Sequence, residues 1–156
     1  MAETTTAKND VSRRTVLAAA IASAGFAGGD CAAGSDGDAD AIAEVQRITG
    51  RAATPSPRLH LAMPSRFANG YTVPLTLRID SEMTQADHVR QAQVLATRNP
   101  INPVATFYFV PGRSEPLVSM RVRLAGPQDV LAIAEMNDGT VLMTRTFVEV
   151  ASNGCE

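Results

Sequence analysis

The sequence predicts an all-β fold, an immunoglobulin-like antiparallel β-sandwich of about seven strands with a short N-terminal helix. Apolar side chains alternate with polar ones in segments such as Val73–Ile79, as in a strand with one buried face. Turn-forming pairs separate such segments at intervals of about ten residues. The length of 156 residues suits one domain, and the hydrophobic content of 45% with 19% charged residues is ordinary for a globular protein. Because only 4% of the residues are aromatic, we expect a core of aliphatic side chains and methionine.

Residues 1–33 are predicted to be an export signal rather than part of the fold. Arg13 and Arg14 precede an apolar run, 16–27, that is too short to span a bilayer. The run "SRRTVL" is similar to the twin-arginine export pattern, which predicts a periplasmic protein with no membrane segment after cleavage. An amphipathic helix is the alternative, but the run has no polar face. Cleavage after Ala24, Ala27 or Ala33 fits the preference of signal peptidase for small residues.

The choice of cleavage site decides how many cysteines remain. A cut after Ala33 removes Cys31 and leaves Cys155 as the only thiol, whereas an earlier cut keeps both. A lipoprotein signal is disfavoured because Asp30 precedes Cys31 where a small residue is needed. A disulfide between Cys31 and Cys155 stays an alternative in an oxidising compartment.

Residues 34–57 are predicted to form a leader and one short helix. Ile42, Val45 and Ile48 recur at helical spacing, acidic residues come early, and Gly50 follows the last turn. The prolines of "RAATPSPR" then end the helical pattern.

Residues 58–150 are predicted to form the sandwich domain. Pro74 lies inside the second strand, which predicts an edge strand or a bulge there. Asp138-Gly139 is a strong hairpin signal. The expected strands are 58–62, 73–79, 89–96, 104–110, 117–124, 130–135 and 141–150.

Composition and motifs disfavour several classes of function. The net charge of −2 and the absence of a basic run with aromatic residues disfavour nucleic-acid binding. His60 and His88 are the only histidines, and neither lies at metal-ligand spacing from another histidine, a cysteine or a carboxylate. We therefore expect no metal site and no catalytic residue, with His60 exposed on the outer face of a strand.

Residues 151–156 are predicted to form a flexible arm that carries Cys155. Ser152 and Asn153 supply no apolar anchor, and Gly154 frees the backbone next to the thiol. Extended at about 3.3 Å per residue, the five steps from Val150 to Cys155 reach roughly 17 Å. Such an arm could deliver a sulfur-bound group into the pockets of several enzymes.

Several segments resemble the SoxY family of thiosulfate-oxidation carriers. "FANGYTVPLTL" at 67–77 is similar to the family's strand entry, and "TRNPINPVATFYFVPG" at 97–112 is similar to its segment rich in Asn-Pro pairs. "VSMRVRLAGPQDVLAIAEMNDGTV" at 118–141 continues the match. "SNGCE" stands where the family has Gly-Gly-Cys-Gly-Gly.

The resemblance implies a sandwich fold, a SoxZ-like sandwich partner and a role as a carrier rather than as an enzyme. It implies that Cys155 is loaded with thiosulfate by a haem enzyme, and that hydrolase and dehydrogenase enzymes then process the adduct. No cofactor other than this covalent sulfur group is implied.

The tail departs from the family pattern at Glu156, which stands in place of the final glycines. The side-chain and terminal carboxylates beside Cys155 should raise the pKa of its thiol. We therefore expect either a variant carrier matched to different enzymes or a paralogue that has lost or changed its cargo. Two other functions compete with the carrier: a non-carrier subunit of a related complex, and a thiol protein that uses Cys155 for disulfide exchange or dimerisation.

Overall fold

The computed structural model describes the backbone of residues 36–151 and the side chains of residues 38–151. Within this range the chain forms one helix and nine strands, which confirms the predicted mostly-β sandwich with a short N-terminal helix. None of the described helices is long and apolar enough to cross a membrane. The elements are α1 (Asp36–Thr49), β1 (Thr54–Pro55), β2 (Leu59–Ala62), β3 (Arg66–Phe67), β4 (Val73–Ile79), β5 (Val89–Ala96), β6 (Ala105–Tyr108), β7 (Leu117–Val122), β8 (Gln128–Met136) and β9 (Val141–Val150).

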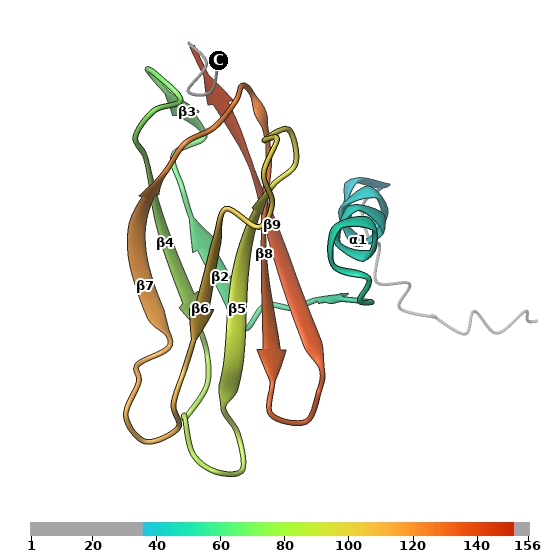
Figure 1. The fold of residues 1–156 in the computed structure, drawn as a ribbon, viewed down its shortest axis with the longest axis vertical. Helices are drawn as coiled ribbons and strands as arrows, with labels where there is room; N and C mark the ends of the chain where they lie inside the picture. Colours follow the sequence, from blue (N-terminus) through green and yellow to red (C-terminus); the bar gives the residue numbers. More distant parts are fainter. Residues whose placement is uncertain (1–35, 152–156) are drawn as a thin grey trace, which may run out of the picture. The chain divides into compact units, whose positions relative to one another are not determined.

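The strands form two sheets that pack face to face (Figure 1). The six-stranded sheet has the order β1-β9-β8-β5-β6, with β3 also paired to β9, and the three-stranded sheet has the order β2-β4-β7. The seven longer strands pair antiparallel within their sheets. β8 and β9 form the predicted hairpin, in which Gly139 has a φ of 86° that favours glycine at the turn.

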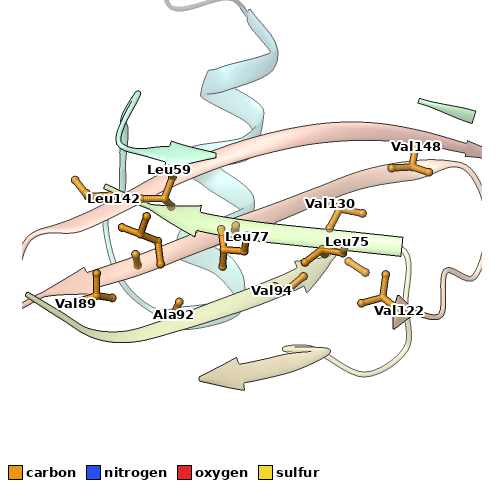
Figure 2. Packing of buried hydrophobic residues seen from close by; sticks show 14 of the residues in the cluster. Leu59, Leu75, Leu77, Val89, Ala92, Val94, Val122, Val130, Leu142 and Val148 are labelled. Atoms are coloured by element: carbon orange, nitrogen blue, oxygen red, sulfur yellow. The ribbon is translucent and has the colours of Figure 1, made fainter. Parts of the chain in front are cut away.

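The core lies between the two sheets and is built from aliphatic side chains (Figure 2). Leu75 and Leu77 of β4 point from the smaller sheet toward Val94 of β5 and Val130 of β8. Their burial follows from the alternation along β4, where the residues facing inward are buried and Pro74 and Arg78 between them are exposed. The sandwich is therefore held by packing of branched side chains, as the low aromatic content predicts.

The helix α1 covers part of the outer face of the six-stranded sheet. Val45 is fully buried and, with Ala41, packs in a second apolar cluster with Leu95 of β5 and Leu131 of β8. Gly50 ends the helix with a φ of 71°, and its N–H donates to the carbonyl of Gln46 at 2.8 Å. The helical stripe and the glycine stop predicted from the sequence are thus confirmed.

Two features differ from the sequence predictions. The two-residue strands β1 and β3 were not predicted, and both pair parallel to β9 in a sandwich expected to be antiparallel. The strand that contains Pro74 is the central strand of its sheet, and no bulge interrupts its pairing with β7, so the prediction of an edge strand or bulge is wrong. The physical reason is local: β2 pairs only with Thr76–Ile79, so at Pro74 β4 has a neighbour on one side alone. The missing proline N–H is tolerated there.

Candidate functional site

The last residues of β9 lie at one end of the sandwich, together with three loops. We call this the C-terminal end, and define it by residues 63–72, 97–104 and 123–127 and by the last residues of β7 and β9. Val148 of β9 lies opposite Gln128, the first residue of β8, and Ala96 at the end of β5 lies opposite Val130. Leu124 donates its N–H to the carbonyl of Gly70, which joins the loops of the two sheets. Any segment after Ala151 therefore starts from this end.

The backbone of β9 is held up to Ala151 by the short strand β3. Phe67 lies opposite Val150, and the Ala151 N–H donates to the Phe67 carbonyl at 3.1 Å. The side chain of Val150 is buried, and Arg66 forms an exposed ion pair with Glu149 at 2.7 Å. The point from which the predicted arm departs is thus fixed by hydrogen bonds and by burial of an apolar side chain.

Neutral amide side chains join the loops of the C-terminal end. Gln128 is only 2% exposed; its Oε1 accepts from the Arg98 N–H at 2.8 Å, and its Nε2 donates to Asn99 Oδ1 at 3.1 Å and to the Gly126 carbonyl at 3.1 Å. Asn99 in turn donates to the Arg123 carbonyl at 2.8 Å. The amides thus satisfy buried backbone groups in these loops without adding charge.

The loops of the C-terminal end carry positive charge. They contain Arg66, Arg98 and Arg123 and no aspartate or glutamate, and Arg121 lies at the end of β7. Arg98, Arg121 and Arg123 are all exposed. Beside them lies a hollow of about 310 Å³ lined mainly by apolar residues, including Ile101, Met120 and Val122.

The opposite end of the sandwich has the reverse charge. We call it the hairpin end, and define it by residues 80–88, 109–116 and 137–140. These loops contain a single arginine, Arg113, and five carboxylates: Asp80, Glu82, Asp87, Glu115 and Asp138.

Two of these carboxylates, Asp87 and Asp80, pair with basic side chains. Hydrogen bonds from the Arg58 guanidinium lower the pKa of Asp87, and a hydrogen bond to His60 is the main cause of the lowered pKa of Asp80. His60 is exposed on the outer face of β2, as predicted, and its Nε2 lies 2.8 Å from Asp80. His88 contacts the Thr84 carbonyl through Nδ1 at 2.9 Å. No group of three or more metal-ligating side chains occurs in the part of the chain that the structure describes.

A larger hollow of about 580 Å³ lies elsewhere, beside the start of α1 and the middle of β9. Its lining includes Pro55, Phe147 and the ion pair of Asp38 with Arg145 at 3.0 Å. These two side chains are the charged residues that line the hollow, and they pair with each other.

The residues predicted to carry the function lie outside the described residues. These are the signal arginines Arg13 and Arg14, the leader cysteine Cys31, and the tail residues Ser152, Asn153, Gly154, Cys155 and Glu156. The sequence reasoning did not find β3, the Gln128 amide contacts or the separation of charge between the two ends. The separation of charge could have been found from the sequence by counting acidic and basic residues in alternate loops.

Comparison with known proteins identifies the family. A family model described as "Sulfur oxidation protein SoxY" matches residues 45–155, from the middle of α1 through the position of Cys155. The chain belongs to the SoxY family. The match includes all nine strands, so the SoxY resemblance predicted from the sequence is confirmed over the whole sandwich.

Solved structures show the same fold as this SoxY family member. The sulfur carrier protein SoxY from Chlorobium limicola f thiosulfatophilum is 21% identical, with a TM-score of 0.57 over 75% of this chain and 99% of that chain. A superoxide reductase (neelaredoxin) from Ignicoccus hospitalis is 18% identical, with a TM-score of 0.52 over 59% of this chain and 79% of that one. Among proteins with curated functions, none matches the sequence. The sandwich is thus shared by proteins with different names, and the fold alone does not assign the function.

Proposed function

We propose that this SoxY family member is a periplasmic sulfur carrier that holds thiosulfate-derived groups on Cys155 and presents them to sulfur-oxidising enzymes. The observation that carries the proposal is that the family match extends through position 155, beyond the last strand of the sandwich. The protein then supplies the attachment point, and its partners supply the catalysis.

Loading of the carrier is an oxidation. The Cys155 thiol and the outer sulfur of thiosulfate form a sulfur–sulfur bond, and the reaction releases the thiol proton and two electrons. A haem enzyme partner accepts the electrons, and the product is an S-thiosulfonate. A hydrolase partner then releases sulfate, and a dehydrogenase partner oxidises the sulfur that remains. No cofactor other than the sulfur adduct is needed on this chain.

The described structure supports this role through the way in which β9 ends. β3 holds the backbone up to Ala151, so the attachment point of the arm keeps one position on the sandwich. Beyond it, Ser152, Asn153 and Gly154 would form the arm, and four residues extended at about 3.3 Å each would let Cys155 reach roughly 13 Å from Ala151. A fixed attachment point with a reach of this size allows one cysteine to enter the sites of several enzymes.

Two free strand edges support the proposed SoxZ-like partner. β6 ends the larger sheet and β7 is an edge strand of the smaller one. Along or beside them Tyr108, Val110 and Leu117 are exposed, with Tyr108 exposed by 75%. Exposed apolar side chains on unpaired edges are features that a second sandwich could cover. Export of the carrier through the signal with Arg13 and Arg14 would bring it to the periplasm.

The test replaces Cys155 with serine in a reconstituted system that contains the partner enzymes. Thiosulfate-dependent turnover should vanish because serine cannot form the sulfur–sulfur bond. The free energy of unfolding should change by less than about 0.5 kcal/mol, as for a site outside the core. Cys31→Ser is the matched control and should keep full turnover. If Cys155→Ser retains turnover, the protein is instead a non-carrier subunit of the complex.

A further inference from the structure

One flank of the described sandwich is closed and the other is open. On the closed flank, β1 and β3 pair with the outer edge of β9. Between them Ser56 donates its N–H to the Met143 carbonyl at 3.0 Å, and Thr146 donates its hydroxyl to the Leu61 carbonyl at 3.2 Å. β6 and β7 lie on the opposite flank (Figure 1), and each is the last strand of its sheet. Two strand edges are therefore open on the same side.

The backbone of β7 presents a regular row of hydrogen-bonding groups to the open flank. Ile79 donates its N–H to the Pro116 carbonyl at 2.9 Å, so these two residues form a hydrogen-bonded pair. Hydrogen-bonded and non-hydrogen-bonded pairs alternate between antiparallel strands, which places Leu117, Ser119 and Arg121 at non-bonded positions of the β4–β7 pair. Their N–H and carbonyl groups therefore point away from β4, where a further strand could pair with them.

β7 lacks the features that commonly protect a sheet edge from pairing with another chain. Its six residues include no proline, and no register shift interrupts its pairing with β4. Its one charged residue is Arg121. β6 is shorter, with four residues, and it lies between Pro103 and Pro111. Of the two edges on the open flank, β7 is thus the better template for a strand of another protein.

The apolar hollow of about 310 Å³ lies against the second half of β7. Met120 and Val122 line it from β7, and Ile101 and Val104 line it from the segment that precedes β6. Ile101 is 76% exposed. A strand paired with β7 would pass this hollow, and an apolar side chain of that strand could fill it and cover Ile101.

Two arginines give the same place a charge that calls for a partner. Arg121 and Arg123 line the hollow and are exposed, and neither forms an ion pair with a residue in the range 38–151. A second copy of this chain would add positive charge to the edge. A strand that carries a carboxylate would instead balance it.

We propose that the SoxZ-like subunit adds a strand to β7, with a carboxylate facing Arg121 and Arg123 and an apolar side chain in the hollow. This inference rests on the proposed partnership and narrows it to one edge of the sandwich and to a partner strand of acidic and aliphatic residues. Backbone hydrogen bonds hold the strand, while the charges set its register and the choice of partner.

The test measures the dissociation constant between the mature chain and the SoxZ-like subunit by isothermal titration calorimetry. Ser119→Pro removes an N–H that points to the open flank and keeps the hydrogen bonds between β4 and β7. We expect it to weaken binding at least tenfold. Thr106→Pro is the matched control, because Thr106 holds the corresponding non-bonded position on β6. It should change the dissociation constant less than twofold.

Arg121→Gln combined with Arg123→Gln tests the charges without changing the backbone, and it decides the question if Ser119→Pro does not fold. Binding should weaken at least threefold at about 0.1 M salt, and the difference should shrink at about 1 M, where the Debye length falls to about 3 Å. Arg113→Gln is the control, because Arg113 also has no ion pair within the described chain but lies at the hairpin end. It should leave the dissociation constant unchanged.

Unchanged binding in the arginine variant would overturn the inference and leave the proposed partnership standing. Equal weakening by Ser119→Pro and Thr106→Pro would also overturn it, because the contact would then not be specific to β7. A dimer of the chain alone that Ser119→Pro dissociates would mean that a second copy covers the edge. Absence of binding to the unsubstituted chain would overturn both the inference and the partnership. None of these outcomes bears on whether Cys155 carries sulfur, which Cys155→Ser tests separately.

Discussion

The two ends of the sandwich are held together by different chemistry. At the C-terminal end, Gln128 and Asn99 join the loops through neutral hydrogen bonds, and the loops contain arginines but no acidic residue. At the hairpin end, Asp87 forms an ion pair with Arg58, and Asp80 forms a hydrogen bond with His60. The loops of the C-terminal end are thus held largely by neutral hydrogen bonds, and the Arg66–Glu149 ion pair adds an exposed charged contact.

The two ends therefore differ in whether charged side chains hold their loops in place. In an ion pair between two fixed residues, each charge is balanced by its partner. A loop that is held by an amide hydrogen bond needs no such pairing, so a neighbouring arginine stays without a partner. At the hairpin end Asp80 and Asp87 take part in holding the loops, and this contribution to stability depends on their ionisation. The C-terminal end should keep its structure over a wider range of pH.

The largest expected effect on stability comes from Gln128. Gln128→Ala removes three hydrogen bonds and leaves the Arg98 N–H and the Asn99 side chain without these partners. We expect the free energy of unfolding to fall by about 2–4 kcal/mol, measured by denaturant unfolding.

Gln93→Ala is the control for this substitution, because Gln93 is half-buried on β5 and makes no side-chain hydrogen bond with the described residues. Its cost should stay below about 1 kcal/mol. Equal losses in the two variants would mean that the amide contacts of Gln128 do not hold the C-terminal end.

A smaller effect is expected from Asp87 at the hairpin end. Asp87→Asn removes a charge that pairs with Arg58 at 2.9 Å, and since both side chains are more than a third exposed, the cost at pH 7 should be about 0.5 kcal/mol. The Arg58 hydrogen bonds hold the pKa of Asp87 below its ordinary value of 3.8. The stabilisation is therefore fully present above pH 3.8 and is lost as the pH falls through the lower pKa of the folded state.

Denaturant unfolding at a series of pH values checks this sign. The difference between Asp87→Asn and the unsubstituted protein should shrink as the solution becomes more acidic. Glu115→Gln serves as the control, because Glu115 is exposed at the same end and has no ion pair among residues 38–151. A difference for Asp87→Asn that grows on acidification would contradict the account of the hairpin end.

Much of the fold could be predicted because local patterns determine it. The alternation of Val73, Leu75 and Leu77 matches their burial, and the spacing of Ile42, Val45 and Ile48 matches the face of α1 that packs on the sheet. These patterns report which side of an element is buried, and so they predict elements and their inner faces.

Contacts between distant segments could not be predicted in the same way. The pairing of Phe67 with Val150 and the contact of Gln128 with Arg98 join residues far apart in the sequence, and no periodicity reports them. The prediction that Pro74 lies in an edge strand or a bulge failed for a related reason. The point at which β2 stops pairing with β4 is set by the partner strand and not by the residues around the proline. The proposed carrier cysteine is the opposite case. Cys155 was singled out by its residue type, its position near the end of the sequence and the resemblance to the SoxY family, and its role stays a prediction.

The central claim is that Cys155 carries a thiosulfate-derived group. Its most direct test is the mass of the peptide that contains Cys155 after the protein has been exposed to thiosulfate. The protein is isolated from cells that oxidise thiosulfate and is digested without reducing agent. The peptide that contains Cys155 is then analysed by mass spectrometry. We predict a thiosulfonate or sulfane-sulfur adduct on Cys155, removed by a thiol reductant and absent from cells grown without sulfur compounds. A bare Cys155 thiol in actively oxidising cells, or a disulfide to a second protein in place of the adduct, would contradict the account.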